Sequence, residues 1–297
     1  MNDQTANYHN TRSRRRHFAV TRLSFAALLS HERPMMKHAA LLACLMASTA
    51  NAGPADGVAK VDVLTGWQTD QGTHMAALRI TLLPGWKTYW RAPGDGGIPP
   101  QVDFSASRGI AAAQFHWPTP EVMDQAGFRT IGYHDGVTVP IELTTTGTGP
   151  LHFAGDLSIG VCEEICVPVH LSFAATLPRN GARDSAIVAS LINRPLTESE
   201  ARVTAATCSI KPIADGLSVT ATLTMPSTGR DEVVVIEASD PLIWVSESDV
   251  TRSGNQITAT SDLIHASTGP FALDRSAMRF TVFGSDHVVD IQGCTGG

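Results

Sequence analysis

The sequence has 297 residues, of which 43% are hydrophobic and 17% are charged, with 22 Lys and Arg against 28 Asp and Glu. This balance predicts a folded globular body and excludes an intrinsically disordered chain, which would carry fewer apolar residues and more charge. The acidic net charge also argues against nucleic acid as a partner.

The first 52 residues are typical of an upstream extension followed by a secretory signal peptide. The stretch MMKH (35–38) precedes a short apolar run at 39–46, and ANA (50–52) fits an A-x-A cleavage site. We expect residues 1–34 to lie upstream of the true start, and cleavage to occur after Ala52. A twin-arginine signal at Arg15 and Arg16 is the alternative, but the polar stretch 31–34 interrupts the apolar segment that such a signal needs.

Cleavage makes the chain more acidic. Residues 1–52 hold 7 of the 22 basic and 2 of the 28 acidic side chains, so 15 basic and 26 acidic groups remain, a net charge of −11. No later run approaches the roughly 18 consecutive apolar residues of a membrane helix. We therefore expect no membrane span in the mature chain, and a product in an oxidising, exported compartment.

From residue 61 onward, apolar and polar residues alternate with period two. Leu78, Ile80 and Leu82 alternate with polar neighbours, and the segments 137–143 and 167–173 show the same pattern. Such runs, broken by Gly, Pro and Asp, indicate half-buried antiparallel strands. Many short strands of this kind predict an all-β sandwich or barrel.

The period changes at 182–196, where Ile187, Val188, Leu191 and Ile192 have helical spacing. Beyond residue 201 the strand pattern returns. It is found around 208–210, 217–223, 232–237, 242–245, 256–260, 278–282 and 287–291. We predict two immunoglobulin-like β-sandwich domains, at 53–180 and 200–297, joined by a short helical linker at 181–199.

Four cysteines survive cleavage, and an even number in an exported chain favours disulfides. Cys162 and Cys166 flank a three-residue loop in the stretch VCEEICVP (161–168). If the flanking segments are paired strands, the two Cα atoms lie roughly 4.5–5.5 Å apart, within reach of a disulfide. Both cysteines alternate with the apolar set, so we expect them to point away from the core.

A disulfide across so short a loop stabilises a fold far less than a long-range bridge. A small, accessible bond is also the labile kind that takes part in exchange. His170 shares the predicted face of Cys166 and is a candidate for tuning the thiols, although a lone strand histidine is commonly a surface residue.

Cys208 and Cys294 bracket the second predicted domain, and we expect a structural disulfide between them. A loop of more than 80 residues would make that bond worth about 4–5 kcal/mol in the chain-entropy model. A second redox pair or two free thiols are the alternatives.

Four blocks resemble the N-terminal periplasmic domain of DsbD-type thiol:disulfide interchange proteins, and are most similar to their ScsB branch. They are GWKTYWRAPGDGGIPP (85–100), FHWPTPE (115–121), GYHDGVTVPIEL (132–143) and VCEEICVP (161–168), which occur in the family's order. The resemblance covers about 61–177 well and the second predicted domain more loosely.

The resemblance implies an immunoglobulin-like redox domain with Cys162 and Cys166 as the catalytic pair. Cys166 would form mixed disulfides with partners, and Cys162 would resolve them. It further implies an active-site surround of Tyr89 and Tyr133 with a cap loop at 124–128, in which Ala126 falls at the family's shielding position and Phe128 two residues later. It requires no cofactor or metal.

The partners implied by the resemblance are periplasmic thioredoxin-fold proteins and a membrane-embedded thiol reductase. The latter would be a separate protein, since the sequence has no membrane electron channel and no C-terminal thioredoxin-like domain. Two other functions remain open from the residues alone. One is a binding or chaperone-like module with a purely structural hairpin disulfide, and the other is Cu(I) handling by the two thiolates.

Overall fold

Strands dominate the computed structural model, which describes residues 57–125, 127–267 and 269–297. The predicted upstream extension and signal peptide lie outside the described residues, as does Ala126. The described residues all belong to one compact unit, Ala52–Gly297. Among them, no helix is long and apolar enough to cross a membrane.

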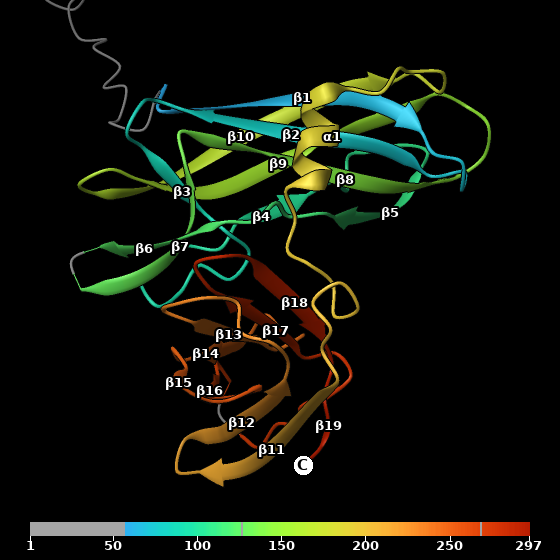
Figure 1. Ribbon diagram of the computed structural model, residues 1–297. Helices are drawn as coiled ribbons and strands as arrows, with labels where there is room; N and C mark the ends of the chain where they lie inside the picture. The colour runs from blue at the N-terminus through green and yellow to red at the C-terminus, as the bar shows by residue number, and fades with distance from the viewer. Residues whose placement is uncertain (1–56, 126, 268) are drawn as a thin grey trace, which may run out of the picture. The chain divides into compact units, whose positions relative to one another are not determined.

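Ten strands form the first sandwich. They are β1 (Ala59–Gln68), β2 (His74–Leu82), β3 (Lys87–Tyr89), β4 (Gln101–Asp103), β5 (Ile110–Phe115), β6 (Glu121–Gln125), β7 (Phe128–His134), β8 (Gly136–Thr145), β9 (Leu151–Cys162) and β10 (Cys166–Leu177). One sheet has the order β1-β2-β8-β5, and the other β10-β9-β3-β7-β6 with β4 paired to β9. Figure 1 shows β9 and β10 as one long hairpin.

The core of the first sandwich follows from the alternation in the sequence. Leu78, Ile80 and Leu82 are buried, whereas Thr81 between them is exposed. On the facing sheet, Ile159 and Val161 of β9 point into the same core cluster. Burying one face of each sheet fixes the strand register, because a slip by one residue would turn every apolar side chain outward.

A single helix, α1 (Ser185–Ile192), follows the first sandwich. Asp184 is its N-cap and accepts hydrogen bonds from the backbone N–H groups of Ala186 and Ile187. Ile187 is fully buried against Met75 and Ala77 of β2, and Figure 1 shows α1 lying over that sheet. The helix is therefore held by a cap and by one apolar contact face.

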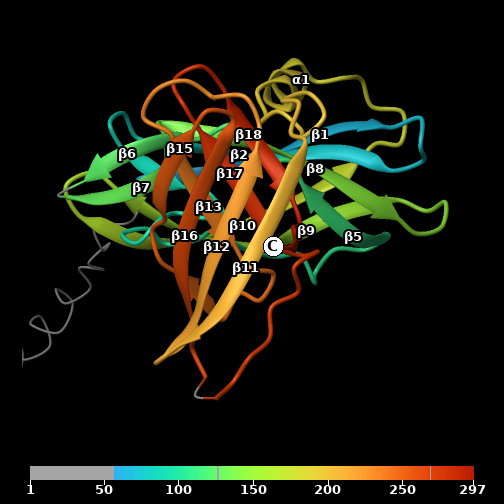
Figure 2. The same cartoon turned by 60° about the horizontal axis from the view of Figure 1, so that its bottom comes forward.

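The second sandwich contains nine strands. They are β11 (Ala205–Ile213), β12 (Gly216–Thr224), β13 (Val233–Glu237), β14 (Ile243–Val245), β15 (Asp249–Ser253), β16 (Gln256–His265), β17 (Arg279–Phe283), β18 (Val288–Gln292) and β19 (Thr295–Gly296). One sheet has the order β14-β16-β12-β11-β19 with β15 paired to β16, and the other β13-β17-β18. Figure 2 shows β11, β12 and β16 side by side. The predicted all-β fold with two sandwiches and a short helix is confirmed.

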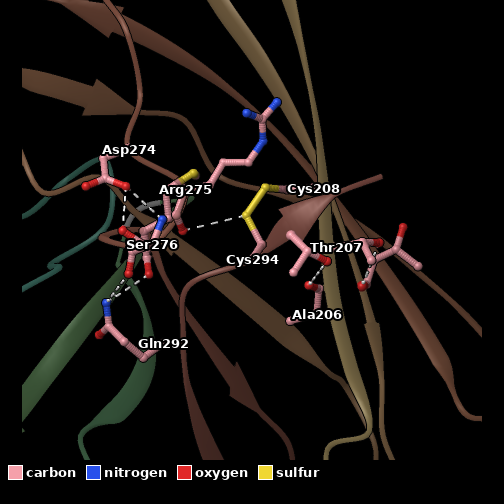
Figure 3. The surroundings of a disulfide bond; sticks show 11 residues. Ala206, Thr207, Cys208, Asp274, Arg275, Ser276, Gln292 and Cys294 are labelled. Carbon is pink, nitrogen blue, oxygen red and sulfur yellow. Dashed lines mark hydrogen bonds between the residues drawn. A yellow bond between two sulfur atoms is a disulfide. The ribbon is translucent and has the colours of Figure 1, made fainter.

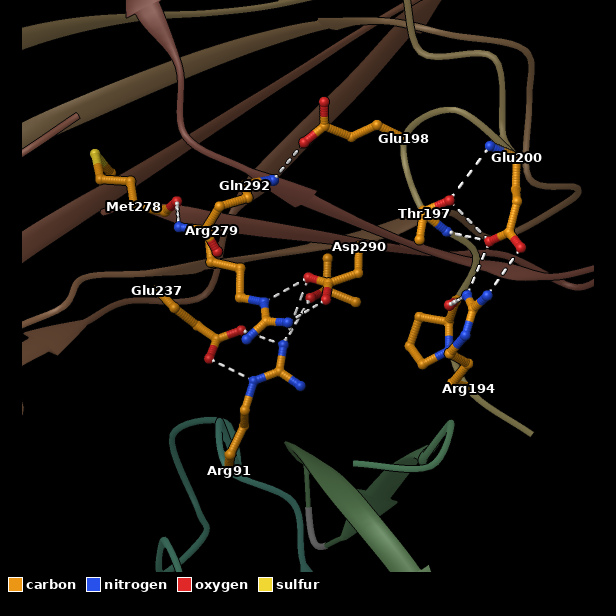
Figure 4. Close-up of polar contacts among 12 residues, drawn as sticks. Arg91, Arg194, Thr197, Glu198, Glu200, Glu237, Met278, Arg279, Asp290 and Gln292 are labelled. Carbon is orange, nitrogen blue, oxygen red and sulfur yellow. Dashed lines mark hydrogen bonds and ion pairs between the residues drawn. The ribbon is translucent and has the colours of Figure 1, made fainter. Parts of the chain in front are cut away.

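Consecutive residues Trp90 and Arg91 join the two sandwiches. Buried Trp90 meets Phe283 of β17 edge to face, with ring centroids 5.7 Å apart. The Arg91 guanidinium lies 3.8 Å from the Trp90 ring centroid and donates two hydrogen bonds of 2.9 Å to Glu237 of β13 (Figure 4). A paired, half-buried guanidinium stacked on an aromatic ring fixes this contact in orientation as well as in distance.

Candidate functional site

The β9–β10 hairpin carries a disulfide at its tip. Cys162 ends β9, Cys166 begins β10, and the two residues are opposite one another in the strand register. Their Cα atoms are 4.2 Å apart and their sulfur atoms are bonded at 2.08 Å. The three-residue loop of Glu163, Glu164 and Ile165 brings them together, because residues that flank a hairpin loop are direct cross-strand neighbours.

The two cysteines differ in their access to solvent. Cys162 has no exposed surface, whereas Cys166 is exposed. The expectation that both would point away from the core holds for the strand faces, since Val161 and not Cys162 belongs to the core cluster. Cys162 is buried because other residues cover the outer face of β9. The hairpin disulfide therefore joins one residue that is open to solvent to one that is closed off from it.

Tyr89 provides much of that cover. Its hydroxyl oxygen lies 2.7 Å from Sγ of Cys162 and 3.1 Å from Sγ of Cys166. Burial raises the pKa of the Tyr89 phenol, so the group keeps its proton at neutral pH. A protonated phenol can donate a hydrogen bond to a thiolate, and hydrogen bonds to charged groups are stronger than neutral ones.

Two glycines make room for the Tyr89 ring. A Cβ atom at Gly160 would lie 3.0 Å from Cε2 of Tyr89 and 2.7 Å from Cβ of Ile98. A Cβ atom at Gly97 would lie 3.0 Å from Cδ1 of the same ring. Gly160 is two residues before Cys162 on β9, so both residues are on one face of the strand. The absence of side chains at these glycines lets the ring reach the sulfurs.

The tip of the β6–β7 hairpin lies near the loop that follows Tyr89 and contains Gly96. Gly127 has a φ of 85° and its N–H donates to Oδ1 of Asp124, which closes the turn. Phe128 begins β7 and is 59% exposed. A Cβ atom at Gly96 would lie 3.2 Å from Cβ of Phe128, so the hairpin tip packs against the loop that follows Tyr89.

The structure does not bring Tyr133 and His170 to the sulfurs. Tyr133 is opposite Thr88, on the other face of the sheet from Tyr89, and its hydroxyl donates to the Pro118 carbonyl at 2.8 Å. His170 shares the face of Cys166 but is four residues further along β10, roughly 13 Å away. Its Nδ1 pairs with Oγ of Ser158 at 2.8 Å.

Lys87 is a further residue of this site, which the sequence pattern did not single out. It is opposite Cys162 on one side and His134 on the other, and only 9% of it is exposed. Burial lowers the pKa of its ammonium group. Lys87 and Tyr89 are two residues apart in the block 85–100, so strand periodicity alone would have placed them on one face.

A second disulfide joins Cys208 of β11 to Cys294, with Cα atoms 5.7 Å apart (Figure 3). The two cysteines are 86 positions apart in the chain. Cys208 is buried in the core of the second sandwich, and Cys294 packs against that core. The bond thereby ties the first strand of this sandwich to the segment before β19. Within the described residues, no group of three or more His, Cys, Asp or Glu side chains could hold a metal ion.

Comparisons with known proteins relate the first sandwich to a described family. Residues 57–178 match the family described as thiol:disulfide interchange protein DsbD, N-terminal. The resemblance seen in the sequence blocks is thereby confirmed for residues 57–178, and the match supports a thiol–disulfide interchange domain in this part of the chain. No curated protein matched the sequence.

Among solved structures, the chain is similar to the N-terminal periplasmic domain of ScsB from Proteus mirabilis. The TM-score is 0.61 at 23% identity, over 82% of this chain and 96% of that one. Because the family match ends at residue 178, a likeness over 82% of the chain includes the fold of the second sandwich. A protein of unknown function from Porphyromonas gingivalis W83 matches with a TM-score of only 0.17 and 9% identity.

Proposed function

We propose, from the premise that residues 57–178 form a DsbD-type interchange domain, that this protein passes electrons between other proteins through Cys162 and Cys166. The observation that carries the proposal is the unequal access to the two bonded sulfurs. Cys166 is exposed while Cys162 is covered. Exchange through a mixed disulfide needs one sulfur that a partner can reach and a second that stays in place to resolve the intermediate.

In the reducing half-reaction, a thiolate of an electron donor attacks Sγ of Cys166. A donor–Cys166 disulfide forms, the Cys162–Cys166 bond breaks, and Cys162 keeps the electron pair as a thiolate. A second donor thiolate then attacks the donor sulfur of the mixed disulfide and releases Cys166. The donor ends as a disulfide, and the hairpin pair has gained two electrons.

In the oxidising half-reaction, the Cys166 thiolate attacks a disulfide of the acceptor protein. One acceptor sulfur leaves as a thiolate, and the other is bonded to Cys166. The Cys162 thiolate then attacks Sγ of Cys166, which restores the hairpin disulfide and releases the acceptor in its reduced form. The Tyr89 hydroxyl, 2.7 Å from Sγ of Cys162, is in place to donate a hydrogen bond to that thiolate in both half-reactions.

The proposed donor is a membrane-embedded thiol reductase, and the proposed acceptors are thioredoxin-fold proteins of the periplasm. Exposed apolar side chains beside the disulfide support docking of a protein rather than a small thiol. Ile165 in the hairpin loop is 63% exposed, and Phe128 and Ile98 near Gly96 and Gly160 are also exposed. Apolar and aromatic residues are typical of the centres of protein interfaces.

A trapping experiment tests the proposal. Cys162→Ser leaves Cys166 able to attack a partner but removes the resolving sulfur, so mixed disulfides should accumulate in periplasmic extracts. Cys166→Ser is the matched control, and it should trap nothing because Cys162 is covered. Adducts from neither variant, or equally from both, would contradict the proposal. A reduction potential of the pair below about −300 mV would instead support a structural staple.

A further inference from the structure

Four residues form a row across the outer face of the sheet that carries the disulfide. Cys166 of β10 is opposite Cys162 of β9, Cys162 is opposite Lys87 of β3, and Lys87 is opposite His134 of β7. Directly opposite residues on neighbouring antiparallel strands project from the same face with Cβ atoms about 4.5–5.5 Å apart. The Lys87 side chain thus begins one strand away from the covered sulfur.

The surroundings of Lys87 are unusual for a lysine. Only 9% of the residue is exposed, and burial, with no neighbouring charge, is the cause of the lowered pKa of its ammonium group. Desolvation without a counter-charge is unfavourable for an ammonium group, and its pKa is lowered accordingly. Packing of the aliphatic stem explains the burial of the Lys87 methylene groups. It does not explain why a lysine stands beside Cys162, whose sulfur becomes anionic on reduction.

We propose that Lys87 is the electrostatic partner of the Cys162 thiolate, and that its positive charge stabilises the reduced form of the hairpin pair. The inference rests on the proposed function, since it concerns the same two sulfurs. In the disulfide, Cys162 carries no charge, and the described residues provide no ion pair for Lys87. On reduction, Sγ of Cys162 gains an electron pair and becomes a thiolate. This thiolate would be the counter-ion of the Lys87 ammonium group. An opposite charge within about 4–6 Å lowers a thiol pKa by about 1–3 units.

Other charged and titratable groups face this row from each neighbouring element. They are Glu163 and Glu164 in the hairpin loop, Tyr89 on β3, His134 on β7 with its partner Glu121 on β6, and His170 further along β10. The two glutamates oppose a thiolate, and His134 is held by a carboxylate at 3.0 Å. Lys87 is the lysine of this row, and its positive charge opposes the effect of the acidic loop on a Cys162 thiolate.

The charge has a predictable effect on the redox equilibrium. A group that stabilises the thiolate stabilises the dithiol state and makes the disulfide a stronger oxidant. Lys87→Met keeps an unbranched apolar stem and removes the charge. It should raise the pKa of the Cys162 thiol by about one unit, which is tenfold less thiolate at a pH below both values. The reduction potential should move to a more negative value.

The first measurement is the pKa of Cys162 in the full chain carrying Cys44→Ser and Cys166→Ser, with Cys208 and Cys294 still bonded. The Cβ chemical shift of ¹³C-labelled cysteine reports the titration. Lys87→Met should raise the midpoint, and Lys87→Arg should leave it near the starting value. Lys60→Met, which removes an exposed lysine of β1, should also leave it unchanged. An unchanged midpoint in a folded Lys87→Met protein overturns the inference.

A second measurement needs no substitution at Lys87, and so remains decisive if Lys87→Met does not fold. Coupling between two ionising groups is reciprocal, so the ammonium pKa of Lys87 must be higher in the reduced protein than in the oxidised one. Side-chain NMR titration of both states measures this difference. Equal values in the two states overturn the inference. Because both measurements use the isolated protein, they can fail while partner trapping by Cys162→Ser succeeds, and the reverse is equally observable.

Discussion

The hydroxyl oxygen of Tyr89 lies 2.7 Å from Sγ of Cys162, although the two residues are 73 positions apart in the chain. Three features produce this contact: the pairing of β3 with β9, the period-two spacing of Tyr89 from Lys87, and the absence of a side chain at Gly160. The covered sulfur thus has a hydrogen-bond donor built into the adjacent strand, while Cys166 is an exposed residue.

Tyr89→Phe should destabilise the thiolate of the reduced hairpin pair without unfolding the domain. The change keeps the ring and removes only the hydroxyl group. A hydrogen bond to a charged group contributes about 1.5–3 kcal/mol, so the pKa of the Cys162 thiol should rise by about one unit or more. The pH dependence of exchange with a model disulfide measures this rise.

Tyr133→Phe is the matched control for Tyr89→Phe. It removes a buried hydroxyl that donates to the Pro118 carbonyl on the opposite face of the same sheet. It should lower the free energy of unfolding by about 1 kcal/mol and leave the thiol pKa unchanged. A similar change in the thiol pKa in both variants would show that Tyr89 acts only through the stability of the domain.

Gly160→Ala should displace Tyr89 from the sulfurs. The added methyl group would lie 2.7 Å from Cβ of Ile98, closer than real Cβ contacts come, and a tight 3.0 Å from Cε2 of Tyr89. Overpacking of this kind costs about 1–3 kcal/mol. Urea denaturation should show that loss, and the rate of reduction by dithiothreitol should rise as the cover opens. Gly149→Ala, where nothing lies within 4 Å, should change neither quantity.

The two disulfides should differ in their effect on stability. In the chain-entropy model, a loop of the size closed by Cys208 and Cys294 is worth about 4.6 kcal/mol, and a loop of the size closed by the hairpin bond about 2 kcal/mol. Replacing the first pair with alanine should therefore lower the free energy of unfolding clearly more than replacing Cys162 and Cys166. Equal losses in urea denaturation would mean that the hairpin bond serves mainly to hold the fold.

Much of the fold could be predicted from the sequence because the strands alternate visibly. Segments such as 78–82 and 167–173 bury their apolar set, and the three-residue loop places Cys162 opposite Cys166. The helix was also predictable from its helical spacing, and Asp184 is its N-cap. Local pattern suffices where the determining contacts are close in the chain.

The site around the sulfurs was harder to predict from the sequence, because it depends on pairing between strands that are distant in the chain. Strand β3 has only three residues, and its position between β7 and β9 follows from tertiary packing. The burial of Cys162 and the position of Lys87 both result from that pairing. Tyr133 and Tyr89 are both in blocks that resemble the family, but strand register places them on opposite faces.

His74 should make the protein less stable in mild acid. Its side chain is buried, and Nε2 donates to the Thr65 carbonyl at 2.6 Å while Nδ1 has no partner in the described structure. Burial, together with the charge of Arg179, lowers the pKa of His74 below 6.5. The unfolded chain then binds the proton more tightly, so stability is complete above about pH 6.5 and falls as the pH drops toward the folded-state pKa. The loss is about 1.4 kcal/mol for each pH unit that separates the unfolded-state pKa from the folded-state pKa.

His74→Gln can keep the bond to Thr65 but cannot titrate, so the loss of unfolding free energy between pH 7.5 and 5.5 should shrink by about that amount. An equal slope in the wild-type protein and in His74→Gln would assign the acid sensitivity to other groups.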